Sequence, residues 1–210
     1  ATRSISSAQK RVEGVNYDAR KQLLQYDDVM RQQRETMYEQ RDYILEHEDI
    51  HSFIESMFKR VISDLVASHV NPESRQLNVD DYVKALDSLG FEGIVRTEDI
   101  EGMNDEQVMD FSTEKAWEDY DQKIEPVRDQ IQDFERNMTL SVIDRAWSDH
   151  IDNMSKLRDG IGLRSYAQSN PLQAYVSEGF QMFEDMQRNI SQDVVNYCMN
   201  VQVVKQEEVA

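Results

Sequence analysis

Apolar side chains along the first part of the chain recur at alternating spacings of three and four, which is a repeat of 3.5 residues. No proline and a single glycine, Gly14, occur between Ser4 and about Glu46, so nothing in this stretch interrupts a helix. The pattern predicts one continuous helix of about 40 residues, roughly 60 Å long at 1.5 Å per residue, which acts as a spine for other elements. The repeat consists of six apolar positions and two glutamines in the same series: Ala19, Leu23, Tyr26, Met30, Met37 and Ile44, with Gln33 and Gln40.

The middle of the chain predicts shorter helices. An amphipathic face runs through residues 53–65, and an Asn-Pro pair at 71–72 ends it. Asn78 can cap a second helix, which Gly90 would terminate. Residues 90–104 read mostly as loop, and the helical pattern resumes at Asp105. Pro126 is expected to interrupt or kink this last helix.

The last third of the chain predicts a helical hairpin. Two apolar stripes at helical spacing flank a segment from Gly160 to Pro171 that contains two glycines and an Asn-Pro pair, which we interpret as a helix stop. Two long helices joined by a loop of about ten residues pack antiparallel. The first stripe also contains His150, which we interpret as a hydrogen-bonded core histidine. The stripes are Leu140, Ile143, Trp147, Met154, Leu157 and Ile161, and then Val176, Phe180, Phe183, Ile190, Val194, Tyr197, Val201 and Val204.

The tip of this hairpin differs in character from the rest of the chain. It carries Arg158 and Arg164 with few acidic groups, and it offers Leu163 and Tyr166 as apolar and aromatic side chains. A mildly basic, partly apolar tip on a stiff stalk is suited to contact with a partner. The alternative from these residues alone is that Tyr166 packs against a neighbour.

The charge distribution divides the chain into three parts. The 210 residues carry a formal net charge of -18. Residues 1–41 hold 8 basic and 6 acidic side chains, residues 42–136 hold 9 and 25, and residues 137–210 hold 6 and 10. The acidic middle indicates an inserted subdomain and disfavours nucleic acid as a partner.

The helical patterns and this insert together predict an all-α fold. A long spine helix (1–41) is packed with an antiparallel two-helix hairpin (138–210), and a smaller helical subdomain (42–137) is inserted between them in the sequence.

Composition excludes several classes of protein. Only 7 Gly and 3 Pro argue against a turn-rich β fold, and the single cysteine, Cys198, excludes a disulfide framework. No apolar run is long enough to cross a membrane and no signal-peptide pattern opens the chain, so we expect a cytoplasmic, reducing environment.

Motifs that carry chemistry are scarce. His47 and His51 match the H-E-x-x-H pattern of zincin metallohydrolases, with Glu48 as the possible base if the segment is helical. Carboxylates crowd this region and no later segment looks built to supply a third ligand, so we expect no metal site and keep a zincin-like hydrolase as a remote alternative. No phosphate-binding loop or nucleophile motif is present. The heptads alone would equally suit a free-standing coiled-coil adaptor.

Longer motifs carry a family resemblance. Residues 7–30 read SAQKRVEGVNYDARKQLLQYDDVM, residues 147–150 read WSDH, and residues 157–168 read LRDGIGLRSYAQ. These runs resemble the helical scaffold domain and two-helix finger of the SecA family, the bacterial preprotein translocase ATPases. Residues 42–137 resemble the family's helical wing only in position and helical character. Ser165 departs from the family, which usually has glycine there.

The resemblance implies the setting and the functional residues. It implies a C-terminal piece of a motor whose other domains bind ATP and magnesium, so that this piece has no catalytic residues and no cofactor of its own. The implied partners are the motor's nucleotide-binding domains, the SecYEG channel and the preprotein, with peripheral association at the inner face of the bacterial membrane. By motif, Tyr166 would contact preprotein, supported by Leu163, Arg164 and Gln168. Trp147 would lie on the inner face of the finger, which restrains ATP turnover.

Overall fold

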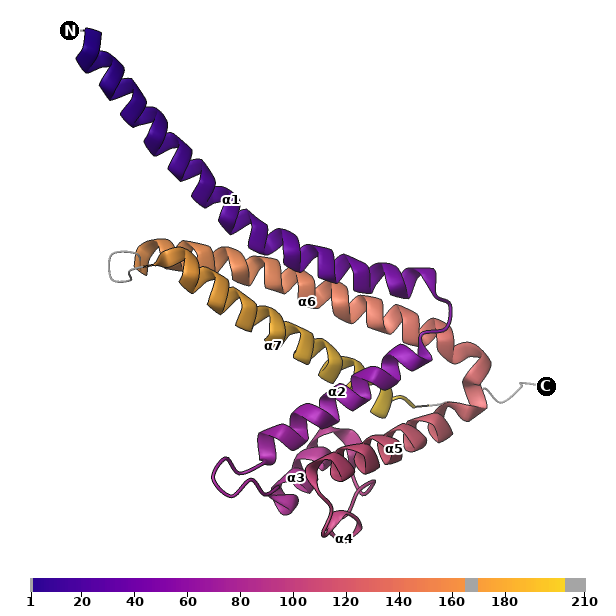
Figure 1. The fold of residues 1–210 in the computed structure, drawn as a ribbon. Coiled ribbons are helices and arrows are strands. Elements are labelled where there is room, and N and C mark those ends of the chain that lie inside the picture. Colours follow the sequence, from indigo (N-terminus) through magenta and orange to yellow (C-terminus); the bar gives the residue numbers. More distant parts are fainter. Residues whose placement is uncertain (1, 165–169, 203–210) are drawn as a thin grey trace. The chain divides into compact units, whose positions relative to one another are not determined.

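The computed structural model describes residues 2–164 and 170–202, and within these ranges the regular elements are helices, with one isolated bridge between Val70 and Leu77 (Figure 1). The all-α prediction is confirmed. The elements in chain order are α1 (Thr2–Glu46), α2 (His51–His69), α3 (Val79–Leu86), η1 (Asp87–Phe91), α4 (Thr97–Ile100), α5 (Asp105–Ile124), η2 (Glu125–Val127), α6 (Arg128–Arg164) and α7 (Pro171–Met199).

The chain forms two compact units. Unit 1 comprises residues 1–42 and 147–186, and unit 2 comprises residues 43–146 and 187–210. Helices α6 and α7 contribute residues to both units. The domain boundaries expected from the charge steps remain a prediction, because this division rests on contacts and not on charge.

Helix α1 is continuous from Thr2 to Glu46, as the 3.5-residue repeat predicts. The repeat is exposed at Leu23 and becomes buried further along, at Gln33 and Met37. The second half of α1 is therefore the part that packs within unit 1.

Unit 1 packs α1 against a hairpin, by which we mean residues 147–164 of α6 and 171–186 of α7. The rings of Tyr26 in α1 and Tyr175 in α7 lie 4.9 Å apart, and Tyr175 is 1% exposed. Burial of such large apolar side chains is the main favourable term that holds the three helices together. The core consists of Met154, Leu157, Ile161 and Tyr175, with Tyr26, Val29, Met30, Ala174 and Met182 packed against it.

Unit 2 is built on contacts between α2 and α5. Phe58 of α2 is fully buried and its ring lies 5.3 Å from that of Trp117 and 5.6 Å from that of Tyr120. The predicted cap at Asn78 is confirmed, since its side chain accepts from a backbone N–H of α3. Gly90 adopts φ 98°, the left-handed conformation that ends a helix and favours glycine.

Two expectations about loops change, and one is confirmed. Residues 90–104 contain the short helix α4, capped where the Asp99 carboxylate accepts from the Arg96 backbone N–H at 3.0 Å. Helix α6 continues through Gly160 and Gly162 to Arg164, residues that we expected to lie in the loop. A helix tolerates an interior glycine at a cost of about 1 kcal/mol, and the buried neighbour Ile161 outweighs it by packing into the core. The turn η2 interrupts the helices at Pro126, as predicted.

Candidate functional site

The far end of the hairpin is where the sequence placed the contact residues. Leu163 lies one residue before the end of α6, and 81% of its surface is exposed. Arg164 is the last residue of α6, whereas Tyr166 and Gln168 lie outside the described residues. The structure therefore brings an exposed apolar side chain to this end of the hairpin, and the full contact set stays a prediction.

The Asn-Pro pair at this end begins a helix and does not stop one. Asn170 is the residue before α7, and its side-chain oxygen accepts a hydrogen bond from the backbone N–H of Gln173 at 3.1 Å. Pro171 occupies the first helical position, where its missing N–H costs nothing and its fixed φ suits the helix. Our interpretation of this pair as a helix stop is wrong, because Asn-Pro serves equally as a helix start.

Trp147 sits beside a buried histidine in α6. The indole is half-buried, and its ring stacks against that of His150 at 5.6 Å between centroids. His150 is 3% exposed and meets the ring of Phe183 of α7 edge-on at 5.7 Å. Burial lowers the pKa of His150, because the charged form is poorly solvated there. The predicted role of His150 as a hydrogen-bonded core histidine is confirmed.

The partner of His150 is Gln33 of α1, which sequence reasoning used only as a filler of the heptad. Its Oε1 lies 2.7 Å from His150 Nε2, and its Nε2 donates to the carbonyl oxygen of Gly179 at 3.1 Å. Gln33 is 8% exposed. We call the two hydrogen bonds of Gln33, to His150 and to Gly179, the junction. A polar residue on the 3.5-residue repeat of one helix, together with a histidine on the apolar stripe of another, was the signal that could have revealed it.

An open groove lies between α1 and α7 of unit 1. The groove has a volume of about 810 Å³, and both apolar and charged side chains line it. Next to the hairpin core, Arg158 pairs with Asp27 at 3.1 Å and lies over the ring of Tyr26 at 5.4 Å. The apolar lining residues are Leu24, Val29, Leu172 and Val176.

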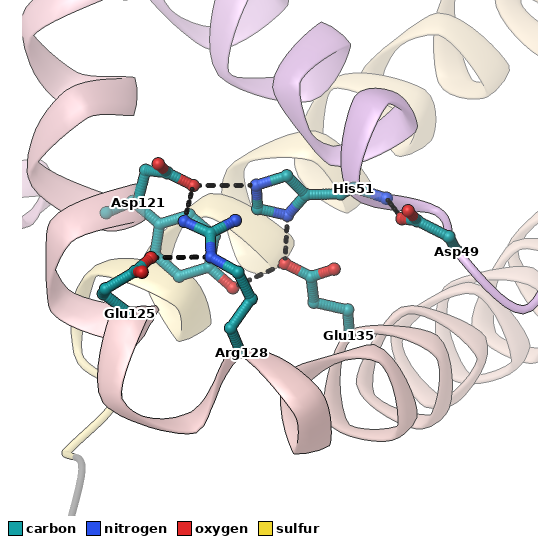
Figure 2. A network of polar contacts seen from close by, with 7 residues as sticks. Asp49, His51, Asp121, Glu125, Arg128 and Glu135 are labelled. Carbon is teal, nitrogen blue, oxygen red and sulfur yellow. Dashed lines mark hydrogen bonds and ion pairs between the residues drawn. The ribbon is translucent and has the colours of Figure 1, made fainter.

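Unit 2 contains a polar network centred on His51, the first residue of α2 (Figure 2). His51 Nδ1 lies 2.8 Å from Oε1 of Glu135, and Nε2 lies 3.2 Å from Oδ1 of Asp121. Tyr120 donates its hydroxyl to the same Glu135 oxygen at 2.9 Å. Arg128 donates to Asp121 at 2.8 Å, and this hydrogen bond is the main reason that the pKa of Asp121 is lowered.

This network shows that the H-E-x-x-H hypothesis is wrong. The segment between α1 and α2 is not helical, so His47 and His51 do not share one helical face. His47 Nδ1 bonds the carbonyl oxygen of Tyr43 at 2.7 Å, and both ring nitrogens of His51 face carboxylates. Within residues 2–164 and 170–202, no group of three or more His, Cys, Asp or Glu side chains is placed to hold a metal ion.

Comparison with known families identifies the setting of these elements. A family model described as the SecA wing and scaffold domain matches residues 1–202. The chain belongs to this family. The SecA wing and scaffold domain is a non-catalytic part of SecA, and membership ties the chain to protein translocation.

Membership in the SecA wing and scaffold family also bears on the alternatives. It favours a part of a SecA motor over a free-standing coiled-coil adaptor as the interpretation of the 3.5-residue repeat in α1.

Among the helices that the structure describes, none is long and apolar enough to cross a bilayer.

Proposed function

We propose that this SecA wing and scaffold domain couples ATP-driven domain movement to the passage of preprotein through the SecYEG channel, and that it restrains ATP turnover. In this proposal α1 transmits movement along its length, and the far end of the hairpin meets the preprotein. ATP and magnesium bind the nucleotide-binding domains of SecA, and the chain works in the cytoplasm at the inner face of the membrane, held there through the channel.

The observation that carries the proposal is the family match over residues 1–202. Two features of unit 1 support the roles within it. Leu163 is 81% exposed at the end of two long helices, which suits apolar contact with a passing unfolded chain. Trp147 is half-buried on the opposite part of the hairpin, beside the junction with α1, which suits a regulatory role.

Contact with preprotein is proposed for Tyr166, supported by Leu163, Arg164 and Gln168. An aromatic ring grips varied side chains through apolar contact without reading sequence. In a SecA motor that carries this segment, Tyr166→Ala is expected to impair translocation while folding and nucleotide binding stay intact. Tyr166→Phe keeps the ring and is expected to be far milder. Normal translocation by Tyr166→Ala would contradict the proposal.

Restraint of ATP turnover is tested separately. The chain is added in trans to a SecA core that lacks it, and basal ATP hydrolysis is measured. We expect the rate to fall, and we expect the chain carrying Trp147→Ala to lower it less. An unchanged or higher rate with the unmodified chain would contradict the proposed restraint of ATP turnover. That result would not bear on the proposed preprotein contact.

A further inference from the structure

We propose that Gln33 is a positioning residue that fixes the register of α1 against the hairpin and links the regulatory Trp147 to α1. The link to regulation rests on the proposed function, whereas the register role rests on contacts within unit 1 alone. Gln33 is the point at which one side chain bonds two other helices, to His150 of α6 and to Gly179 of α7.

The orientation of the Gln33 amide follows from its neighbours. The carbonyl oxygen of Gly179 can only accept a hydrogen bond, so the NH₂ group of Gln33 must face it. The amide oxygen of Gln33 then faces His150 and can only accept, so His150 Nε2 must carry a proton. The junction thus selects one tautomer of a neutral His150, with its proton on Nε2.

The junction is specific for one register because both bonds are buried. Gln33 is 8% exposed and His150 is 3% exposed, so neither has water as an alternative partner on its bonded side. Sliding or rotating α1 by one residue would carry the amide away from both partners and leave buried polar groups unpaired. The apolar heptad positions on either side would tolerate such a slip far better, since apolar packing is not directional.

The neighbourhood of Gly179 makes the junction tight. A Cβ atom added to Gly179 would lie 2.7 Å from Cε of Met154, so the end of the Met154 side chain packs directly against Gly179. The bond from Gln33 therefore reaches a carbonyl whose position is fixed by the packing of the hairpin. A single polar residue at a seam position is a known way to specify register in coiled coils.

Trp147 is joined to this junction by direct contact. Its ring stacks on His150 at 5.6 Å, and His150 bonds Gln33 at 2.7 Å. A movement of the indole displaces the imidazole, and the imidazole holds the α1 amide. This gives a contiguous physical route from the inner face of the hairpin to the spine helix.

The register role is tested on the chain itself by a double-mutant cycle. We expect Gln33→Leu to raise the unfolding equilibrium constant of unit 1 about tenfold, because it leaves His150 Nε2 unpaired. Gln32→Leu, on the exposed face of the same helix, serves as the matched control and is expected to stay within about twofold. Adding His150→Leu to Gln33→Leu should recover part of the loss, since it removes the imidazole N–H that Gln33→Leu leaves unpaired.

A spectroscopic readout separates positioning from general packing. Nitrogen-15 NMR of the ring should show His150 as the Nε2–H tautomer, with its Nε2–H proton protected from exchange with solvent by the bond to Gln33. Gln33→Leu should remove that protection while the control keeps it. Simple additivity in the cycle together with an Nε2–H proton that is absent or exchanges equally fast in both variants would overturn the register role.

The link to regulation is tested in a SecA motor that carries the segment. Trp147→Ala and Gln33→Leu should each raise basal ATP hydrolysis severalfold, and the pair should not exceed the larger single effect. If Trp147→Ala raises the rate and Gln33→Leu does not, the link through Gln33 is overturned. If neither raises it, the proposed restraint itself fails, and the register role is judged by the cycle and the tautomer alone.

Discussion

His51 Nδ1 lies 2.8 Å from Oε1 of Glu135, so the first residue of α2 is bound to a carboxylate of α6 that is fully buried. The other ring nitrogen of His51 faces Asp121 of α5 at 3.2 Å. Ionised carboxylates only accept hydrogen bonds, so both nitrogens donate at once only when the ring is the imidazolium cation. The bond to Glu135 is the main cause of the raised pKa of His51.

The stability of unit 2 should therefore fall as pH rises through the raised pKa of His51. Folding raises the pKa of His51 above its ordinary value of 6.5, so the folded chain binds this proton more tightly than the unfolded chain. The stability that results is fully present below pH 6.5. It is lost as pH rises through the raised pKa. Other charges around the ring belong to Asp49, Asp121, Glu135 and Arg128. We expect amide exchange at the start of α2 to quicken across that window, beyond its intrinsic dependence on pH.

His51→Gln should remove this extra dependence, because the amide does not titrate. His47→Gln is the matched control, since His47 is exposed, its ring nitrogen bonds a backbone carbonyl of α1, and its ring stacks on Tyr43 at 4.1 Å, with no carboxylate among the partners described for it. An identical pH dependence of amide exchange in the unmodified chain and in His51→Gln would show that the imidazolium does not stabilise the start of α2.

The sequence was sufficient to predict the helices that depend on local pattern. The length of α1 follows from an uninterrupted repeat, and the cap at Asn78 and the stop at Gly90 follow from residue chemistry. The extent of α6 was missed because its two glycines look like loop, whereas burial of Ile161 keeps the helix going.

Which side chains the polar groups bond could not be predicted from the sequence, even though Gln33 and His150 stand out on their apolar repeats. Gln33 bonds partners that lie 117 and 146 residues away, and His51 bonds partners 70 and 84 residues away. Neither pairing has a local signature, because it depends on how helices distant in sequence come together. The H-E-x-x-H pattern, kept only as a remote alternative, lacks its helical geometry because α1 ends at Glu46 and α2 begins at His51.

Cys198 should be unreactive in the folded chain. It is fully buried in α7, and burial raises the pKa of its thiol to about 12, so almost no thiolate exists near neutral pH. We expect alkylation by iodoacetamide at pH 7.5 to be at least tenfold slower in the native chain than in denaturant. Equal rates in the two conditions would mean that this part of unit 2 opens readily.

Two glycines of the hairpin should respond in opposite ways to alanine. Gly160 has open space around its Cβ direction, so Gly160→Ala should raise the free energy of unfolding by about 0.5–1 kcal/mol through helix propensity. Gly179→Ala would press on Met154, which is 1% exposed and must shift within the core, so it should lower that free energy by about 1–2 kcal/mol. Denaturant titration measures both, and stabilisation by Gly179→Ala would show that the Met154 side chain moves aside at no cost.

The claim that the far end of the hairpin meets the translocating chain is tested most directly by photo-crosslinking. A crosslinking amino acid replaces Leu163, which is 81% exposed near the end of α6, or Ile151, which is 43% exposed earlier on the same helix. In a SecA motor stalled with a preprotein in the SecYEG channel, position 163 should crosslink to the preprotein and position 151 should not. Crosslinking at 151 with none at 163, or equal yields at both positions, would contradict a preprotein contact at the end of the hairpin.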